Sequence, residues 1–463
     1  MQRLWSTHMS TISTSPPARK AALDLYRAVW RWHFYAGLLV LPFLIILSLT
    51  GALYLFNDEL DAFIHSDLKR VAVQEAAQPP AAQVSAALQD YPGTAVKYTS
   101  PATPESSAEI TVNTLSGERL AVYVNPYTAE VLGSLDDRGT VMWTVRYLHS
   151  FKLFGQTPRK LIEMAAGWSI LLVATGIYLW WPRNGRDGVV SVRGKPNSRV
   201  FWRDLHAVLG IFTGGVIVFL AITGMPWSGV WGGQVNQWAN GNNFGYPSGV
   251  RVEVPMSNAY LSDQGTTSWS LEQAQVPEST SLPTPTPRLG LNSIVAILDE
   301  LGLQQGYVVN LPTTAAGVYT GSIYPDDLAQ QRVIHLDQYS GEPLIDMRYA
   351  DYGPLGRWLE FGINVHLGQE FGLANQLFLL AACLAIIVMC VAAGVMWWKR
   401  RPSGAMGVPP LPADTRVFRG LIALLVIGGL LFPLVGASLL VMLVIDWCIV
   451  RPRQERRLAR HAT

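Results

Sequence analysis

The stretch RWHFYAGLLVLPFLIILSLTGALYLF, residues 31–56, decides the fold class, because it is long and apolar enough to cross a bilayer. A membrane-spanning helix needs about 20 predominantly apolar residues. Similar runs lie near 162–181, 206–226 and 376–398. No small-residue cleavage site follows the first run, so we do not expect a cleaved signal peptide. The sequence therefore predicts an α-helical polytopic membrane protein.

Charge is distributed unevenly along the chain, although the formal net charge is only +2. Charged residues make up 15% of the sequence, against roughly 25% in soluble domains. Residues 1–32 carry five basic side chains and one acidic, whereas 57–148 carries six basic and twelve acidic. Short loops rich in Lys and Arg stay in the cytoplasm. We therefore expect the N-terminus to lie inside, in the cytoplasm, and the two long loops to lie outside.

The last apolar run, 417–450, is longer than a single membrane-spanning helix requires and contains Pro433 near its middle. Basic segments flank it on both sides, which favours a hairpin of two short helices. The alternative is that the segment forms one long tilted helix.

Two halves of the sequence share a spacing of unusual residues. His33 and His206 are each followed by Gly at the fourth position, and later by a Thr-Gly pair at matching positions, Thr50-Gly51 and Thr223-Gly224. A second constant offset superposes His149 on His366 and the Phe-Gly that follows each of them. The sequence therefore predicts an internal duplication, and functional sites of duplicated membrane proteins usually lie where the halves meet.

Each long loop is expected to hold a small α+β module. The first has a helix at 77–90 and strands near 95–99, 108–113, 119–124 and 129–132; the second has a helix at 290–302 and strands near 306–310, 317–324, 332–337 and 343–348. The whole chain is thus predicted to run as follows: cytoplasmic tail 1–32, helix 33–56, module 57–148, His motif and helix 149–181, cytoplasmic loop 182–205, helix 206–226, loop and module 227–365, His motif and helix 366–398, cytoplasmic loop 399–416, hydrophobic segment 417–450 and cytoplasmic tail 451–463.

Several function classes are excluded. The long loops contain no Cys, so they hold no disulfide, iron–sulfur cluster or Cys-zinc site. No G-x-G-x-x-G follows a predicted strand, so we expect no nicotinamide or flavin domain. We also expect no nucleic-acid partner.

Four of the eight histidines form two pairs at two depths. His33 and His206 lie at the cytoplasmic ends of their helices, and His149 and His366 lie near the outer interface. Facing helices can supply both axial imidazoles to a haem iron, which favours electron transfer. Gly37 and Gly210 would let a flat macrocycle approach the backbone on the same helix face. We therefore predict two bis-His haem b groups, an inner one and an outer one; the alternative is that these histidines are packing or interfacial residues.

Other residues are candidates for smaller roles. Arg146 shortly precedes His149 and is a candidate partner for a haem propionate. The loop after residue 226 is rich in aromatic side chains, which would either form a substrate cradle or pack on the bilayer surface. These candidate substrate residues are Trp227, Trp231, Trp238, Phe244 and Tyr246.

The chain resembles the PepSY-associated transmembrane helix family, in particular its iron-regulated inner-membrane proteins and siderophore-iron reductases. The resemblance is carried by YRAVWRWHFYAGLLVLPFLIILSLTGALYLF (26–56), NPYTAEVLG (125–133), DQYSGEPL (337–344), the His motifs followed by FG, and the helix ends WWPR and WWKRRP. It implies periplasmic PepSY modules, b-type haem, and reduction of a periplasmic ferric siderophore that releases Fe(II). The haem-ligand role carries over to the four paired histidines.

Three functions remain open at this point. The first is a transmembrane ferric-siderophore reductase that takes electrons from a membrane quinol or a separate reductase. The second is a non-redox PepSY scaffold with a binding or regulatory role. The third is a transporter, against which the helices show no charges at the bilayer midplane. An absorption spectrum of the purified protein separates the first from the other two.

Overall fold

The computed structural model describes residues 17–182, 189–246, 254–265, 267–280, 287–402, 407–409, 415–453 and 456. The chain forms two compact units. The first unit comprises Met1–Leu44, Gly167–Val218 and Val388–Thr463, and the second comprises Ile45–Ala166 and Phe219–Ile387. Four long helices contribute residues to both units: α1 (Pro17–Tyr54), α6 (Gln156–Trp180), α7 (Arg199–Gly224) and α12 (Gly372–Arg400).

Long apolar helices are the main elements of the first unit. Over the described residues, five helical segments are long and apolar enough to cross a membrane: Leu25–Tyr54, Gln156–Trp180, Arg199–Trp227, Gly372–Arg400 and Pro433–Arg453. α1 continues through Pro42. An internal proline costs a helix one backbone hydrogen bond, and neighbouring helices in membranes can make up for that loss.

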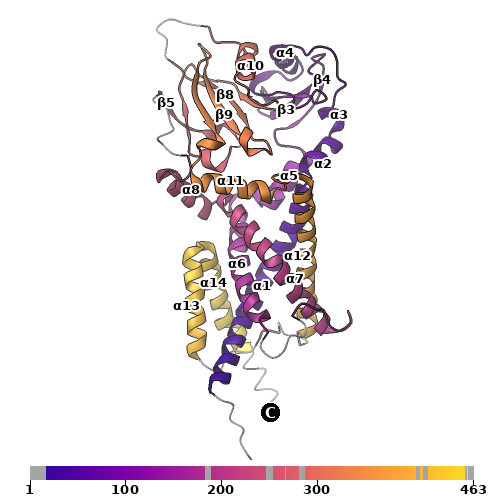
Figure 1. Ribbon diagram of the computed structural model, residues 1–463, viewed down its shortest axis with the longest axis vertical. Coiled ribbons are helices and arrows are strands. Elements are labelled where there is room, and N and C mark those ends of the chain that lie inside the picture. The colour runs from indigo at the N-terminus through magenta and orange to yellow at the C-terminus, as the bar shows by residue number, and fades with distance from the viewer. Residues whose placement is uncertain are drawn as a thin grey trace, which may run out of the picture. The chain divides into compact units, whose positions relative to one another are not determined.

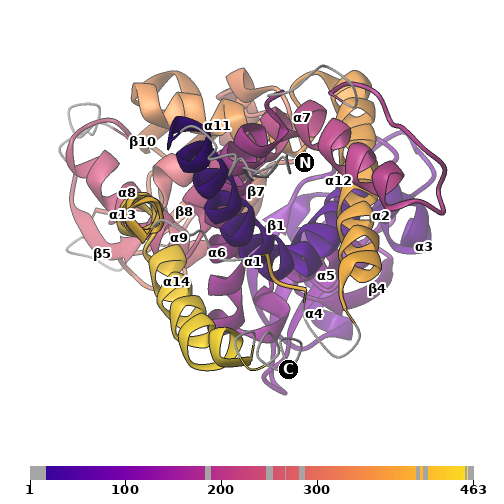
Figure 2. The ribbon, with the colours of Figure 1, turned by 90° about the horizontal axis from the view of Figure 1, so that it is seen from below.

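The segment 417–450 divides into two helices, α13 (Thr415–Leu431) and α14 (Pro433–Ile445). Phe432 between them has an extended backbone, and Pro433 takes the first helical turn, where its missing N–H costs nothing. Figures 1 and 2 show the two helices as neighbours. They approach closely at Gly429 and Gly436, where a Cβ on either residue would meet the other's backbone.

α14 is anchored to the rest of the first unit by polar contacts. It continues into one π-helical turn, Asp446–Val450. Asp446 accepts hydrogen bonds from Arg31 and Tyr35 of α1 and from Arg451, with Arg451 Nε at 2.9 Å. Arg31 also donates to the carbonyl of Pro409. Both Arg31 and Asp446 are buried, so this ion pair depends on its partners for solvation.

One eight-stranded antiparallel sheet dominates the second unit (Figure 1). Its spatial order is β10-β9-β8-β7-β1-β2-β3-β4. The strands are β1 (Gly93–Thr99), β2 (Ala108–Thr114), β3 (Arg119–Val124), β4 (Val131–Asp136), β7 (Val308–Asn310), β8 (Val318–Ile323), β9 (Arg332–Asp337) and β10 (Pro343–Arg348). The two expected modules therefore share one sheet. Their seam is the β1–β7 ladder, which pairs Lys97 with Asn310, Tyr98 with Val309 and Thr99 with Val308.

Two helices cover one face of the sheet. α4 (Pro80–Asp90) belongs to the first module and α10 (Leu291–Glu300) to the second. They lie side by side (Figure 1) and are joined by a 2.9 Å hydrogen bond from Ala81 N to Asn292 Oδ1. Alternate strand residues, among them Ile110, Val309 and Ile334, pack beneath them in one continuous core. The period-2 apolar pattern of these strands therefore buries one face.

Shorter elements complete the second unit. They are α2 (Asn57–Ile64), α3 (Ser66–Lys69), α5 (Val141–His149), η1 (Lys152–Phe154), η2 (Met225–Trp227), α8 (Trp231–Gly241), β5 (Met256–Tyr260), α9 (Leu261–Gln264), η4 (Trp269–Leu271), β6 (Gln275–Pro277), η5 (Leu328–Gln330), η6 (Tyr349–Asp351) and α11 (Pro354–His366). The edge strand β4 leads through a short connection into α5, and the opposite edge strand β10 leads through another into α11. The sheet thus positions the two helices whose last residues are His149 and His366.

Candidate functional site: two pairs of histidines

The second unit contains the pair His149 and His366. Each histidine is the last residue of a short helix and contacts a threonine of a long helix. His149 Nδ1 lies 2.9 Å from Thr50 Oγ1 of α1, and His366 Nδ1 lies 2.9 Å from Thr223 Oγ1 of α7. The same arrangement is therefore built twice, from residues that correspond in the two halves of the sequence.

The threonine contacts determine which ring nitrogen carries the proton. Thr50 Oγ1 donates to the carbonyl of Ile46 at 2.6 Å, and Thr223 Oγ1 donates to that of Phe219 at 2.8 Å. Each hydroxyl has used its one hydrogen, so it accepts the hydrogen bond from the histidine Nδ1–H. The lone pair of each ring is consequently on Nε2, the nitrogen that remains available to a metal.

A glycine after each threonine lets the ring approach the helix. A Cβ at Gly51 would lie 3.5 Å from His149 Cε1, and one at Gly224 would lie 3.4 Å from His366 Cε1. Burial lowers the pKa of His149 to about 4. Burial, followed by the nearby charge of His149, lowers the pKa of His366 to about 3. Both rings are therefore neutral at pH 7, as a metal ligand must be.

The first unit contains the pair His33 of α1 and His206 of α7. Their ring centroids are 6.5 Å apart and their planes are inclined at 75°. His33 Nδ1 lies 2.9 Å from Thr175 Oγ1, whose hydrogen goes to the Leu171 carbonyl at 2.8 Å. His206 Nδ1 lies 3.1 Å from the Met389 carbonyl, which can only accept. In the described part of the chain, no hydrogen bond reaches Nε2 of any of the four rings.

A cavity of about 630 Å³ adjoins His33 and His206. Small-molecule sites usually have about 300–1,000 Å³. Gly37 and Gly210 both line it. A Cβ there would make ordinary contacts with the protein, 3.9 Å from Leu172 at Gly37 and 3.6 Å from Met389 at Gly210. Protein packing alone therefore does not require glycine at these positions, and a side chain there would reduce the cavity.

The pair His33 and His206 fits a metal ion held between two imidazoles. Two metal–nitrogen bonds of about 2 Å each, with the distance from each nitrogen to its ring centre, sum to about 6 Å; the observed separation is 6.5 Å. Within the described ranges, no three His, Cys, Asp or Glu side chains gather to hold a metal ion. Two facing imidazoles with an adjoining cavity are a donor set that would suit an iron porphyrin.

Arg146, the candidate propionate partner, lies on α5 with an exposed side chain. Its guanidinium lies 4.8 Å from the Trp143 ring centroid, and its Nη1 donates to Tyr54 OH at 3.5 Å. Further cations lie close by: burial, and then Arg159, Arg138 and Arg146, lower the pKa of Lys152. A positive patch, defined by Arg138, Arg146, Lys152 and Arg159, thus lies on the same segment as His149.

The five candidate substrate aromatics have different surroundings. Tyr246 is buried and packs edge-on against Tyr352, with ring centroids 6.3 Å apart. Trp238 and Phe244 are exposed and contact one another at 5.4 Å. Trp227 packs against a buried cluster that includes Trp269, whereas Trp231 begins α8. The backbone N–H groups of Val230 and Trp231 donate to the buried carboxylate of Glu163, which stabilises the start of this helix. Residues 247–253 of the same loop lie outside the described residues.

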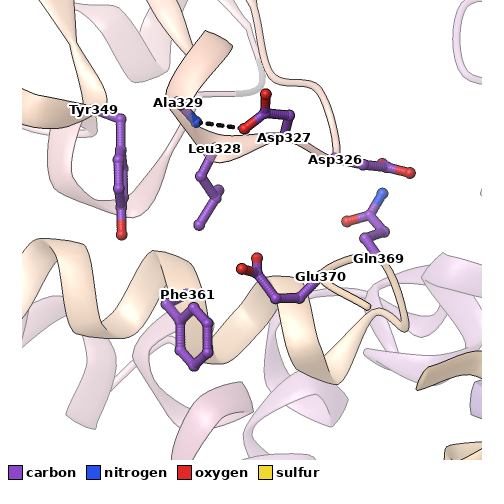
Figure 3. A pocket seen from close by; sticks show the side chains of 8 residues that line it. All are labelled: Asp326, Asp327, Leu328, Ala329, Tyr349, Phe361, Gln369 and Glu370. Carbon is purple, nitrogen blue, oxygen red and sulfur yellow. Dashed lines mark hydrogen bonds between the residues drawn. The ribbon is translucent and has the colours of Figure 1, made fainter. Parts of the chain in front are cut away.

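The second unit has a separate acidic cavity of about 520 Å³ (Figure 3). Its lining residues are Asp326, Asp327, Leu328, Ala329, Tyr349, Phe361, Gln369 and Glu370. Asp327 accepts a 3.0 Å hydrogen bond from Ala329 N, drawn in Figure 3. Burial, and then the charge of Glu59, raise the pKa of Asp326. This cavity contains none of the five candidate aromatics.

Comparison with known proteins places the sequence in a family. Residues 30–400 match the family described as PepSY-associated TM region. The chain belongs to this family. The comparison with curated proteins found no match. In this PepSY-associated membrane protein, the matched residues include all four paired histidines, and α13 and α14 lie beyond them.

The threonines that contact the histidines were not predicted as site residues. A signal for two of them exists, because a Thr-Gly pair follows His33 and His206 at the same spacing. Thr175-Gly176 is a third such pair, and a Cβ on Gly176 would lie 3.4 Å from His33 Cε1. The offset that superposes His149 on His366 leads from Thr175 to Ala392. Because alanine offers no acceptor, His206 uses a backbone carbonyl instead.

Proposed function

We propose that this protein is a di-haem b reductase of the bacterial inner membrane, which passes electrons across the membrane to a ferric siderophore in the periplasm. Ferric siderophores hold Fe(III) tightly through hard oxygen donors, whereas they bind Fe(II) weakly. Adding one electron to the chelated ion therefore releases it. Oxidation of one membrane quinol to quinone gives two electrons and two protons, which is enough to reduce two ferric ions; a separate reductase is the alternative donor.

The observation that carries this proposal is the tautomer shared by four histidines in two pairs. In each ring Nδ1–H donates to an oxygen of another helix, so Nε2 presents its lone pair. Such outer hydrogen bonds orient a metal-bound histidine and raise its basicity. Haem b, when bound by two such imidazoles, supplies reversible one-electron transfer with no open position for oxygen.

The protein's own residues would hold the two groups. His33 with His206, and His149 with His366, would hold the two haem groups, and Gly37 and Gly210 would leave space for the one beside His33 and His206. α1 carries both His33 and Thr50, the contact of His149.

Charge supports the proposed direction of transfer. The segments expected in the cytoplasm are rich in Lys and Arg, which supports an orientation with the sheet in the periplasm. The positive patch beside His149 would attract an anionic ferric chelate and raise its local concentration. The acidic cavity of Figure 3 would instead repel such a chelate.

The test is an absorption spectrum of the full-length protein purified in detergent, oxidised and then reduced with dithionite. We expect the sharp reduced bands of six-coordinate haem b and two haems per chain. His149→Ala should lose about one haem per chain. His65→Ala is the matched control, because His65 lies in the same unit but accepts a 3.3 Å hydrogen bond from Val141 N and contacts Asp61.

A colourless wild-type protein would contradict the proposal and favour a non-redox scaffold. Full haem content in all four single-histidine variants would defeat the ligand assignment. Release of Fe(II) from a ferric trihydroxamate, followed by trapping with ferrozine in the presence of a reduced quinone analogue, tests the substrate separately. A protein that contains haem but fails this assay has another acceptor, such as a copper complex.

A further inference from the structure

The cavity beside His33 and His206 has an excess of positive charge. Four arginines and one aspartate line it: Arg193, Arg199, Arg203, Arg400 and Asp204. Asp204 is buried, and its oxygens lie 2.8 Å from Arg193 Nε and 2.6 Å from Arg203 Nη2. This carboxylate is therefore already shared by two guanidiniums and is not available to neutralise the others.

Arg199 and Arg400 have no carboxylate partner in the described part of the chain. Both line the same cavity. Arg400 is held in place by aromatic rings, with its guanidinium carbon 4.8 Å from the Trp30 centroid and 5.1 Å from that of Phe34. It also donates to the carbonyl of Gly407. The side chain of Arg400 is partly buried, so an anion in the cavity would replace hydration that its charge has lost.

The position of the two arginines indicates where that anion would lie. Arg199 is the first residue of α7 and Arg400 is the last residue of α12. The N-terminus of α7 adds the positive end of its helix dipole, which favours anions further. Arg199 is exposed, so a carboxylate bound here would keep part of its hydration.

We propose that Arg199 and Arg400 bind the two propionate carboxylates of the porphyrin whose iron is held by His33 and His206. This inference rests on the proposed function. Guanidinium groups bind carboxylates through paired, charge-assisted hydrogen bonds. One cavity would thus recognise both ends of the group, its metal through the imidazoles and its acid groups through the arginines. The phosphate of an anionic lipid is the competing ligand for the same cations.

The experiment compares Arg199→Gln, Arg400→Gln and Arg401→Gln in the full-length holoprotein. Arg401 is the matched control: its replacement removes the same charge next to Arg400, but its guanidinium lies 3.5 Å from the Trp398 ring centroid and it is not among the cavity residues. Haem loss to excess apomyoglobin and the midpoint potentials are measured for each variant. Phospholipid phosphorus bound to the purified protein is measured in parallel.

We expect one of the two haems to dissociate about 10- to 100-fold faster in Arg199→Gln and in Arg400→Gln, because each variant loses a hydrogen bond to a charged group. The midpoint potential of that haem should fall, since an unneutralised propionate stabilises the ferric ion. The second haem and the Arg401→Gln protein should resemble wild type. A structural role alone would not lower the potential of one haem selectively.

Two results would overturn the inference alone. In the first, the wild-type protein contains two haems, and the haem loss rates and midpoint potentials of all three variants equal those of the wild type. The other is loss of bound phospholipid from the Arg199 and Arg400 variants with unchanged haem binding, which would assign the cations to a lipid phosphate. A colourless wild-type protein would instead overturn the proposed function and this inference together.

Discussion

Replacement of Thr223 by valine tests whether the threonine contacts serve the histidines. Valine has nearly the same shape as threonine but cannot accept the hydrogen bond from His366 Nδ1–H, which is 2.9 Å long. The buried N–H would then lack a partner. We expect weaker retention of the outer haem and a higher midpoint potential for it, because the imidazole becomes a poorer electron donor to the ferric ion.

The size of the effect follows from the contact that is lost. An unsatisfied buried donor costs about 1–3 kcal/mol. At about 1.4 kcal/mol per factor of ten, the outer haem should dissociate about 5- to 150-fold faster. Mutations of residues that hydrogen-bond to a metal-bound side chain commonly reduce metal affinity by about 10- to 100-fold, which is the same range.

The assay follows haem loss to apomyoglobin and a potentiometric titration of the α-band. Thr213→Val is the matched control. Thr213 lies on the same helix, is buried, and donates to the carbonyl of Leu209 at 2.8 Å, as Thr223 does to that of Phe219. Its other polar contact is the Met389 sulfur at 3.9 Å. Equal haem loss and equal potentials in the two variants would refute the assigned role of Thr223.

Three further variants probe the cavity, the C-terminal anchor and the sheet. Gly210→Leu should fill the cavity beside His33 and His206 and reduce the haem content by about one per chain. Gly215→Leu should leave the haem content unchanged, because a Cβ there meets nothing within 4 Å. Pyridine haemochrome spectra measure the haem content of both variants. Asp446→Asn should lower the free energy of unfolding by about 3–5 kcal/mol, because it removes the charge that neutralises a buried guanidinium. The control Asp346→Asn, in a partly exposed ion pair, should lower it by about 1 kcal/mol or less. Denaturant titrations in detergent measure both variants, and equal losses would contradict the prediction. Burial lowers the pKa of His335 from 6.5 to about 3. As the pH falls, the unfolded chain therefore binds a proton before the folded chain does, and the free energy of unfolding should decrease between about pH 6.5 and pH 3. His335→Gln should flatten this pH dependence in thermal melts, and an unchanged pH dependence would exclude His335 as its cause.

Much of the fold can be predicted because its determinants are local. Apolar length identifies the spans, and period-2 alternation with turn residues identifies the strands. The expected strand near 119–124 coincides with β3, and that near 332–337 with β9. The start of α4 at Pro80 follows from the preference of proline for the first helical turn.

The join between the modules could not be predicted in this way. β1 ends at Thr99 and β7 begins only at Val308, and nothing in either strand specifies its partner across such a distance. The same limit applies within the site. Spacing predicted four matched histidines, but whether His33 contacts Thr175 depends on how α1 packs against α6. The cluster of Arg199 and Arg400 likewise forms only when the ends of α7 and α12 come together.

The seam between β1 and β7 helps to fix the distance between His149 and His366. Three residue pairs connect the two modules there, and the opposite rims of the sheet continue into the helices that end in His149 and His366. The spacing of two imidazoles from opposite halves of the sequence is thus set partly by a short ladder of main-chain hydrogen bonds. Opening that ladder would separate the two imidazoles without altering either one.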